Sequence, residues 1–337
     1  MFEHILKKYG INQIKKTEKL NITRVNEAYK IKTEKGNFFL KKNLFPLTKK
    51  QLNFKFDLML HLDQKKFPVI LPIKTKKGDS FVKLKTRTYE VYPWIDNLKE
   101  YNTFKGQAYE KRYNQAVKLL ADFHKDTKNF KTKNTAHTEP TALKDITAFY
   151  EEDKRKKHTK KTIPPIMKII TTKTELDKKI HAYKDELKQL IKEVAKYIKK
   201  RKKEKKRIVH YDFNPTNIVF KDNEKKPYAL LDFEFSHYDL IELDIIKAAK
   251  FFSETNSGKS ININKFKKFI NTYKKYNNIK LKKEDAYYMT LFIVLRRLIY
   301  TLQYRYFINK KFKFSPEKDF KCTNYIIKNK NKFLKIK

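Results

Sequence analysis

The stretch between residues 208 and 234 constrains the fold of this chain more than any other part. Three short apolar segments alternate in it with polar residues: 208–209, 218–220 and 228–231. A polar loop, residues 210–217, joins the first two segments, and the third ends on Asp232 and Glu234. Because alternate side chains of a strand point to the same side, these two carboxylates are expected to lie together. The stretch therefore predicts three strands with polar groups gathered at their ends.

The loop and the third strand carry groups that suit phosphate chemistry. Phosphoryl transfer from a nucleotide needs a carboxylate that orients or deprotonates the acceptor hydroxyl, and oxygen ligands that hold magnesium against the phosphates. Asp212 and Asn217, five residues apart on one loop, can face a common point. Together with Asp232 and Glu234, they could supply both kinds of group.

Strand patterns dominate the first hundred residues, and one helix interrupts them. The predicted strands are 29–33, 38–41, a hairpin over 73–84 with its turn at 77–79, and 89–95. Thr48, followed three residues later by Gln51, forms a capping-box pattern that begins the helix, and Phe67-Pro68 stops it. This part of the chain is predicted to be a β-rich lobe.

Beyond residue 105 the apolar spacing becomes helical. The predicted helices are one around 116–123, one long helix over 176–197, and three more over 244–254, 265–276 and 284–309. The stretch 125–165 is polar and rich in lysine. The sequence therefore predicts an α+β chain with a β-rich first lobe, residues 1–95, and a larger helical lobe, residues 96–337.

The formal net charge of +44 suggests nucleic acid, an anionic membrane or an acidic substrate as a partner. However, only nine of the 81 basic residues are arginine, and the lysines are scattered along the chain. Surfaces that read bases or grip phosphates favour arginine, whose planar donors pair bidentately. A nucleic-acid partner is therefore disfavoured. The densest basic block, residues 199–207, is interpreted as a solvated helix end rather than a polyanion-binding patch.

The cysteine content and the lack of long apolar runs indicate the cellular compartment of the protein. Cys322 is the single cysteine, so an internal disulfide is excluded and a buried, inert thiol is expected. The N-terminus lacks the apolar run of a secretory signal, and no stretch is apolar enough to span a membrane. A cytoplasmic protein without a membrane partner is predicted.

The order His210-x-Asp212-x-x-x-x-Asn217, a strand, and Asp232-x-Glu234 resembles the catalytic core of the aminoglycoside phosphotransferase/choline kinase superfamily, which has the protein-kinase fold. The resemblance covers roughly residues 10–310. It also includes the strand lysine within 36–41, the hinge strand at 89–95, the Leu-Ala-x-x-His pattern at 120–124, and Asp244. With its opening Tyr9-Gly10-Ile11, the chain is most similar to the CotS-type spore-coat kinase-like branch, and homoserine kinase is a second neighbour.

The resemblance implies ATP and Mg²⁺ as cofactors, the hydroxyl of a small molecule as acceptor, and a bilobal kinase-like fold. It implies that Asp212 is the catalytic base and that Lys41 contacts the nucleotide phosphates, with Lys42 as the competing choice. His210 and His124 are expected to be structural. The remaining implied site residues are Glu90 and Tyr92 beside the nucleotide, and Asn217, Asp232 and Glu234 at the metal.

Three departures favour an alternative, a kinase-like structural or coat-assembly protein that no longer catalyses. Tyr211 replaces the usual glycine, Glu234 replaces the second aspartate, and residues 21–26 lack a glycine where a phosphate-covering loop is expected. A spore-coat location in place of the cytoplasm is implied if the CotS-type resemblance holds. Asp57 is the nearest acidic residue on the first helix that could partner the lysine. A third interpretation, a nucleic-acid or polyphosphate binder, rests on charge alone.

Overall fold

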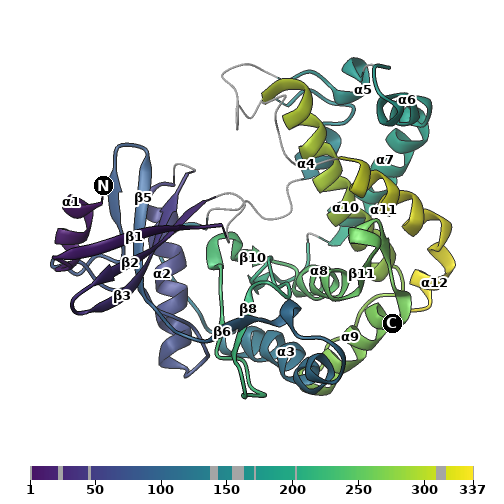
Figure 1. Cartoon of the computed structure of the whole chain (residues 1–337). Coiled ribbons are helices and arrows are strands. Elements are labelled where there is room, and N and C mark those ends of the chain that lie inside the picture. The colour runs from purple at the N-terminus through teal and green to yellow at the C-terminus, as the bar shows by residue number, and fades with distance from the viewer. Residues whose placement is uncertain are drawn as a thin grey trace. The chain divides into compact units, whose positions relative to one another are not determined.

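The computed structural model describes residues 2–21, 26–44, 47–136, 143–153, 163–170, 172–201, 203–308 and 316–336. The chain forms two compact units (Figure 1), one of residues Met1–Thr138 and Pro215–Ser236, the other of Glu139–Asn214 and His237–Lys337. The predicted division into a β-rich lobe, residues 1–95, and a helical lobe, residues 96–337, stays a prediction.

The first unit contains a five-stranded antiparallel sheet of order β1-β2-β3-β5-β4. Its strands are β1 (Ile14–Leu20), β2 (Glu27–Thr33), β3 (Gly36–Asn43), β4 (Val82–Leu84) and β5 (Arg87–Pro93). The predicted hairpin over 29–41 is confirmed, with Thr33 paired to Gly36 at its turn. Apolar side chains of β2, β3 and β5, including Ile31, Leu40 and Val91, bury one face of the sheet with the N-terminal segment.

The first unit also contains several helices and a second sheet. They are α1 (Glu3–Leu6), η1 (Lys7–Tyr9), α2 (Lys49–Gln64), η2 (Tyr101–Thr103), α3 (Gly106–Asp126) and η3 (Phe233–Phe235), with the strands β6 (Leu98–Glu100), β8 (Ile218–Lys221) and β9 (Ala229–Leu230) in the order β6-β8-β9. The capping box at the start of α2 is confirmed, since Thr48 and Gln51 exchange side-chain and backbone hydrogen bonds.

One hairpin prediction in this unit is wrong. The predicted turn exists, because the Gly78 amide donates to the Thr75 carbonyl at 2.8 Å. No strand forms around Ile73, however, and the hairpin joins β4 to β5 through Lys85 and Thr86. The Ile73 amide instead makes a single bond to the Val91 carbonyl at 2.7 Å. The glycine marked a local turn correctly, but strand pairing depends on a partner that sequence spacing does not identify.

The second unit is mainly helical. Its helices are α4 (Leu143–Thr147), α5 (Ile166–Ile169), α6 (Glu175–Ala182), α7 (Lys184–Arg201), α8 (Ile241–Ser253), η4 (Asn256–Gly258), α9 (Ile263–Tyr276), α10 (Asp285–Gln303), the π-helix η5 (Tyr304–Ile308), α11 (Pro316–Lys328) and α12 (Lys330–Leu334). Its strands β7 (Arg207–Val209) and β10 (His237–Asp239) pair antiparallel, as do β11 (Glu254–Thr255) and β12 (Ser260–Ile261). The α10 helix is almost wholly buried, and Cys322 is buried as predicted.

Two predictions for this unit are corrected. The long helix predicted over 176–197 is two helices, α6 and α7, with a break at Tyr183, whose ring is exposed. The basic block 199–207 is not simply a solvated helix end, because Arg201 is buried. Its guanidinium pairs with Asp285 at 3.0 Å and with Glu242 at 3.2 Å. Lys202 of this block lies outside the described residues.

Candidate functional site: the Lys41 carboxylate cluster

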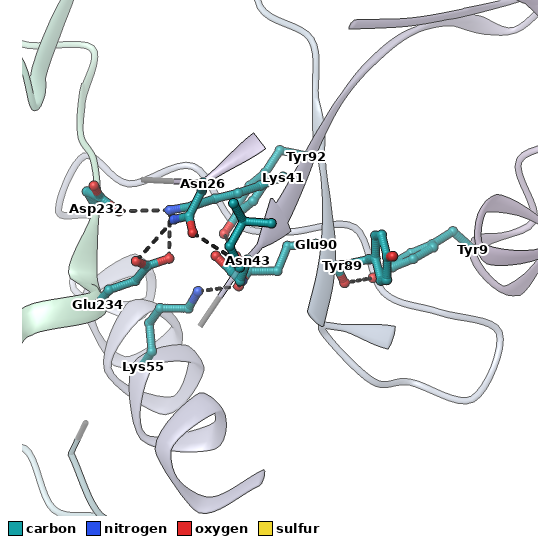
Figure 2. A network of polar contacts seen from close by, with 11 residues as sticks. Tyr9, Asn26, Lys41, Asn43, Lys55, Tyr89, Glu90, Tyr92, Asp232 and Glu234 are labelled. Atoms are coloured by element: carbon teal, nitrogen blue, oxygen red, sulfur yellow. Dashed lines mark hydrogen bonds and ion pairs between the residues drawn. The ribbon is translucent and has the colours of Figure 1, made fainter. Parts of the chain in front are cut away.

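Lys41 lies on β3 with its side chain on the face of the sheet opposite Leu40. Its Nζ donates to Asp232 Oδ1 at 2.8 Å and contacts Glu234 Oε1 at 2.7 Å, as Figure 2 shows. Burial alone would lower the pKa of Lys41, but the carboxylates of Asp232, Glu234 and Glu90 outweigh it and raise this pKa well above the usual value. The structure thus joins a strand lysine to two carboxylates nearly two hundred residues away.

The backbone at the ends of β8 and β9 brings Asn217 close to Asp232. Ile218 pairs with Leu230, and the Leu231 amide donates to the Asn217 carbonyl at 2.8 Å. Asp232 follows directly, in the left-handed region with φ of 66°. The ends of these two neighbouring strands therefore present Asn217 and Asp232 from adjacent backbone positions.

The competing lysine, Lys42, faces a different partner. Its Nζ contacts Glu27 Oε2 on β2 at 2.7 Å. Because adjacent residues of a strand point to opposite faces, only one of the two lysines can share a face with Asp232. The geometry favours Lys41 as the lysine near the nucleotide phosphates, and Lys42 becomes a natural control.

The residues predicted to lie beside the nucleotide, Glu90 and Tyr92, contact each other and neighbouring residues. The Glu90 carboxylate is fully buried, and the Tyr92 hydroxyl donates to it at 2.6 Å. A contact of either residue with adenine stays a prediction. Asp57 does not face Lys41, because its Oδ2 accepts hydrogen bonds from Thr132 and Asn134. Of the predicted phosphate-covering loop, residues 22–25 lie outside the described residues.

The loop that carries Asp212 belongs to the second unit and is held by Asp244. The buried Asp244 carboxylate accepts hydrogen bonds from the His210 amide at 2.8 Å and the Tyr211 amide at 2.9 Å. The Asp212 amide in turn donates to His210 Nδ1 at 3.3 Å. His210 therefore supports the loop, as expected, and Asp244 fixes the backbone immediately before the candidate base.

Tyr211 adopts a conformation that glycine adopts more readily. Its φ is 64°, in the left-handed region. The buried ring compensates with contacts: Arg296 donates to its hydroxyl, His237 packs edge-on against it, and Lys247 Nζ lies 3.7 Å from its centroid. Arg296 is paired with Asp145 at 2.6 Å. The departure from glycine is thus built into the packing of the second unit.

Replacing Tyr211 by glycine is therefore expected to destabilise the protein. Losing a buried aromatic side chain costs about 3–5 kcal/mol, whereas relief of the left-handed backbone returns about 1–2 kcal/mol. The free energy of unfolding in urea should fall by about 2 kcal/mol. Tyr211→Phe, which removes only the hydroxyl, should cost about 1 kcal/mol. A glycine variant as stable as the parent would show that the ring contacts contribute no more than the relief of the backbone returns.

Lys247 on α8 approaches the same loop. Its Nζ donates to the Tyr211 carbonyl, and burial lowers the pKa of Lys247 to about 8, against the opposing effect of Asp212. Between about pH 8 and the ordinary lysine value near 10.4, the unfolded chain binds a proton that the folded chain does not, so stability rises with pH.

We therefore expect the free energy of unfolding of the parent, relative to Lys247→Met, to rise by about 1 kcal/mol between pH 8 and pH 10. This is less than the full linkage value because the side chain is only half-buried. Urea unfolding of both proteins across this range measures the difference. A constant difference would mean that Lys247 keeps its ordinary pKa in the folded state.

The donor set of the Lys41 cluster suits a hard cation together with phosphates. Carboxylate and amide oxygens are the ligands that Mg²⁺ prefers, and it usually takes only one or two carboxylates plus phosphate oxygens and water. Within the described ranges, no group of three or more His, Cys, Asp and Glu side chains is arranged to hold a metal alone. Asp232, Glu234 and Asn217 therefore fit a magnesium ion that arrives with a nucleotide.

Sequence reasoning missed two members of this cluster, Lys55 and Asn43. Both donate to the Glu90 carboxylate at 2.6 Å. Lys55 lies among the apolar residues on the buried side of α2. Lysine is seldom found in such a position unless it is paired, and this was the available signal for Lys55. No spacing rule pointed to Asn43.

Comparisons with solved structures identify the fold. The chain aligns over 98% of its length with spectinomycin phosphotransferase APH(9)-Ia bound to ADP and spectinomycin, at 15% identity, 98% coverage of that chain and a TM-score of 0.66. It aligns similarly with amicoumacin kinase hAmiN bound to AMP-PNP and Ca²⁺ (14% identity, 98% and 93% coverage, TM-score 0.65) and with a microcompartment-associated aminopropanol kinase (10% identity, 99% and 98% coverage, TM-score 0.64). These likenesses confirm the α+β kinase-like fold.

No curated protein gives a significant sequence match. No helix in the described part of the chain is long and apolar enough to cross a bilayer. The model of the phosphotransferase enzyme family (APH) matches residues 17–271, which include Lys41, the Asp212 loop and the Asp232 strand. On that match, which spans most of its length, the chain belongs to the phosphotransferase enzyme family.

Proposed function

We propose that this protein transfers the γ-phosphate of ATP to a hydroxyl group of a small molecule. The observation that carries the proposal is the contact of Lys41 with both Asp232 and Glu234. A lysine placed beside two carboxylates is what a nucleotide-phosphate and metal site needs, because the lysine can pair with phosphate oxygens while the carboxylates ligate the metal.

Each residue has a role in the proposal. Lys41 binds the phosphates, and Asn217, Asp232 and Glu234 hold Mg²⁺, which when bound neutralises charge on the phosphates and polarises them. Asp212 orients the acceptor hydroxyl and takes its proton. Glu90 and Tyr92 lie on the strand proposed to run beside adenine.

The acceptor class is an amino alcohol, a sugar or a hydroxy amino acid. The structural neighbours named above carry spectinomycin and aminopropanol in their names, and an ethanolamine kinase of Plasmodium vivax is a further neighbour (15% identity, 94% and 83% coverage, TM-score 0.58). Within the family we place the chain nearest the CotS-type branch, on the opening Tyr9-Gly10-Ile11, with homoserine kinase next. We propose that the protein acts in the cytoplasm. A spore-coat location would go with membership of the CotS-type branch.

Binding of Mg²⁺-ATP, measured by isothermal titration calorimetry, tests the phosphate site. Lys41→Met is expected to raise Kd about tenfold or more, because a charged hydrogen bond to phosphate contributes about 1.5–3 kcal/mol. Lys42→Met, one residue along the same strand and paired with Glu27, should leave Kd within about twofold of the parent.

Transfer is then measured as ATP consumption with panels of amino alcohols, sugars and hydroxy amino acids. Acceptor-dependent consumption would support the proposal. Binding of Mg²⁺-ATP without transfer to any acceptor would favour the inactive structural protein. If the parent does not bind nucleotide at all, the proposed phosphotransferase activity is wrong.

A further inference from the structure

Glu90, at the centre of β5, is fully buried, and three side chains donate to its carboxylate. Asn43 Nδ2 and Lys55 Nζ donate to Oε1 at 2.6 Å each, and the Tyr92 hydroxyl donates to Oε2 at 2.6 Å (Figure 2). Burying an ionised carboxylate is costly unless it is paired and hydrogen-bonded, so this arrangement needs an explanation. Lys55 supplies the opposite charge and is itself buried.

The sheet register places Glu90 directly beside Lys41. The two residues are cross-strand partners of β3 and β5, and such partners have side chains on one face with Cβ atoms about 4.5–5.5 Å apart. Asn43 and Tyr92, two residues along their strands from Lys41 and Glu90, share that face. The Glu90 network therefore surrounds the base of the Lys41 side chain.

In kinase-like phosphotransfer the strand lysine is held by a carboxylate of the neighbouring helix. Here the helix α2 presents Lys55 at this place, and its Asp57 is engaged by Thr132 and Asn134. The charges are thus reversed between helix and sheet. The carboxylate comes from β5, and the helix contributes the ammonium group that keeps it ionised.

We propose that Glu90, held by Lys55, is the positioning residue that keeps Lys41 directed toward the nucleotide phosphates. The inference rests on the proposed function. In the structure Lys41 pairs with Asp232 and Glu234. When these two carboxylates ligate a metal, they are no longer available to Lys41. Glu90 is enclosed by its own donors and cannot join the metal, so it remains as a negative charge beside Lys41.

The test is a thermodynamic cycle on the full-length protein, with Kd for Mg²⁺-ATP as the readout. Its four members are the parent, Lys41→Met, the pair variant Glu90→Gln/Lys55→Met, and the variant with all three substitutions. The pair variant removes both buried charges together with little change in volume, and such replacements are often neutral for stability. Urea unfolding of each member checks folding.

If Glu90 acts through Lys41, the pair variant raises Kd about tenfold, and the triple variant binds no more weakly than Lys41→Met alone. If Glu90 has only a structural role, one of two results is expected. Either the pair variant leaves Kd unchanged, or the triple variant raises Kd by the product of the separate effects. Both results overturn the inference. If the pair variant fails to fold, Glu90→Gln alone, with the same shape, replaces it in the cycle.

The outcomes separate this inference from the proposed function. A parent that binds Mg²⁺-ATP tightly, with a pair variant that binds equally well, overturns the role of Glu90 and leaves the phosphotransferase proposal in place. A parent that does not bind Mg²⁺-ATP overturns both.

Discussion

Asp212→Asn is expected to lower kcat about 10³-fold while Kd for Mg²⁺-ATP stays within about twofold of the parent. The amide has nearly the same size as the carboxylate, and the backbone of the loop is held by Asp244 and His210. It cannot accept a proton from the acceptor hydroxyl, and general-base catalysis typically contributes 10²- to 10⁴-fold. Single-turnover transfer of phosphate separates this loss from product release.

Asp185→Asn, an exposed position on α7 of the same unit, is the matched control and should keep parental kcat. If Asp212→Asn transferred phosphate as fast as the parent, Asp212 would not be the base. If it lost nucleotide binding as well as kcat, its role would be in binding rather than in proton transfer.

Asp232→Asn is expected to lower kcat/KM on the order of 10²- to 10³-fold and to raise the Mg²⁺ concentration needed for half-maximal activity. A neutral amide oxygen is a weaker ligand for Mg²⁺ than a carboxylate, and charge stabilisation by a bound metal is worth several kcal/mol in the transition state. The substitution also removes one of the two carboxylates that Lys41 contacts. Activity titrated against Mg²⁺ at saturating ATP measures the effect.

Asp222→Asn serves as the control for charge, because Asp222 lies in the same unit and forms an exposed pair with Lys99. It should leave the Mg²⁺ dependence unchanged, as exposed pairs contribute little. An Asp232→Asn variant with a parental Mg²⁺ dependence would exclude Asp232 from the metal site.

Local patterns predicted the parts of the site that lie close together in sequence. The capping box at Thr48 and Gln51, the hairpin of β2 and β3, and the strands β7, β8 and β9 all follow from alternation, turn residues and caps. Strand alternation also separated Lys41 from Lys42, since their side chains face different carboxylates in the structure.

The remaining features depend on contacts that local patterns do not encode. The apolar spacing over 176–197 continues through Tyr183, yet the helix breaks there, because tertiary packing rather than periodicity decides where a helix ends. The Glu90 and Lys55 pair could not be predicted, since the place of Lys55 among apolar residues of a helix does not identify its partner on β5. Arg201, within a basic block, is buried for the same kind of reason.

The central claim is that Lys41, Asn217, Asp232 and Glu234 form one site for a magnesium-bound nucleotide. A crystal structure with AMP-PNP and Mn²⁺, read by anomalous scattering, tests it most directly. We predict a manganese peak within ligand distance of Asp232 and Asn217, with Lys41 Nζ moved onto a phosphate oxygen and still beside Glu90. A nucleotide bound elsewhere, or manganese absent while Lys41 keeps its contacts with Asp232 and Glu234, would contradict the claim.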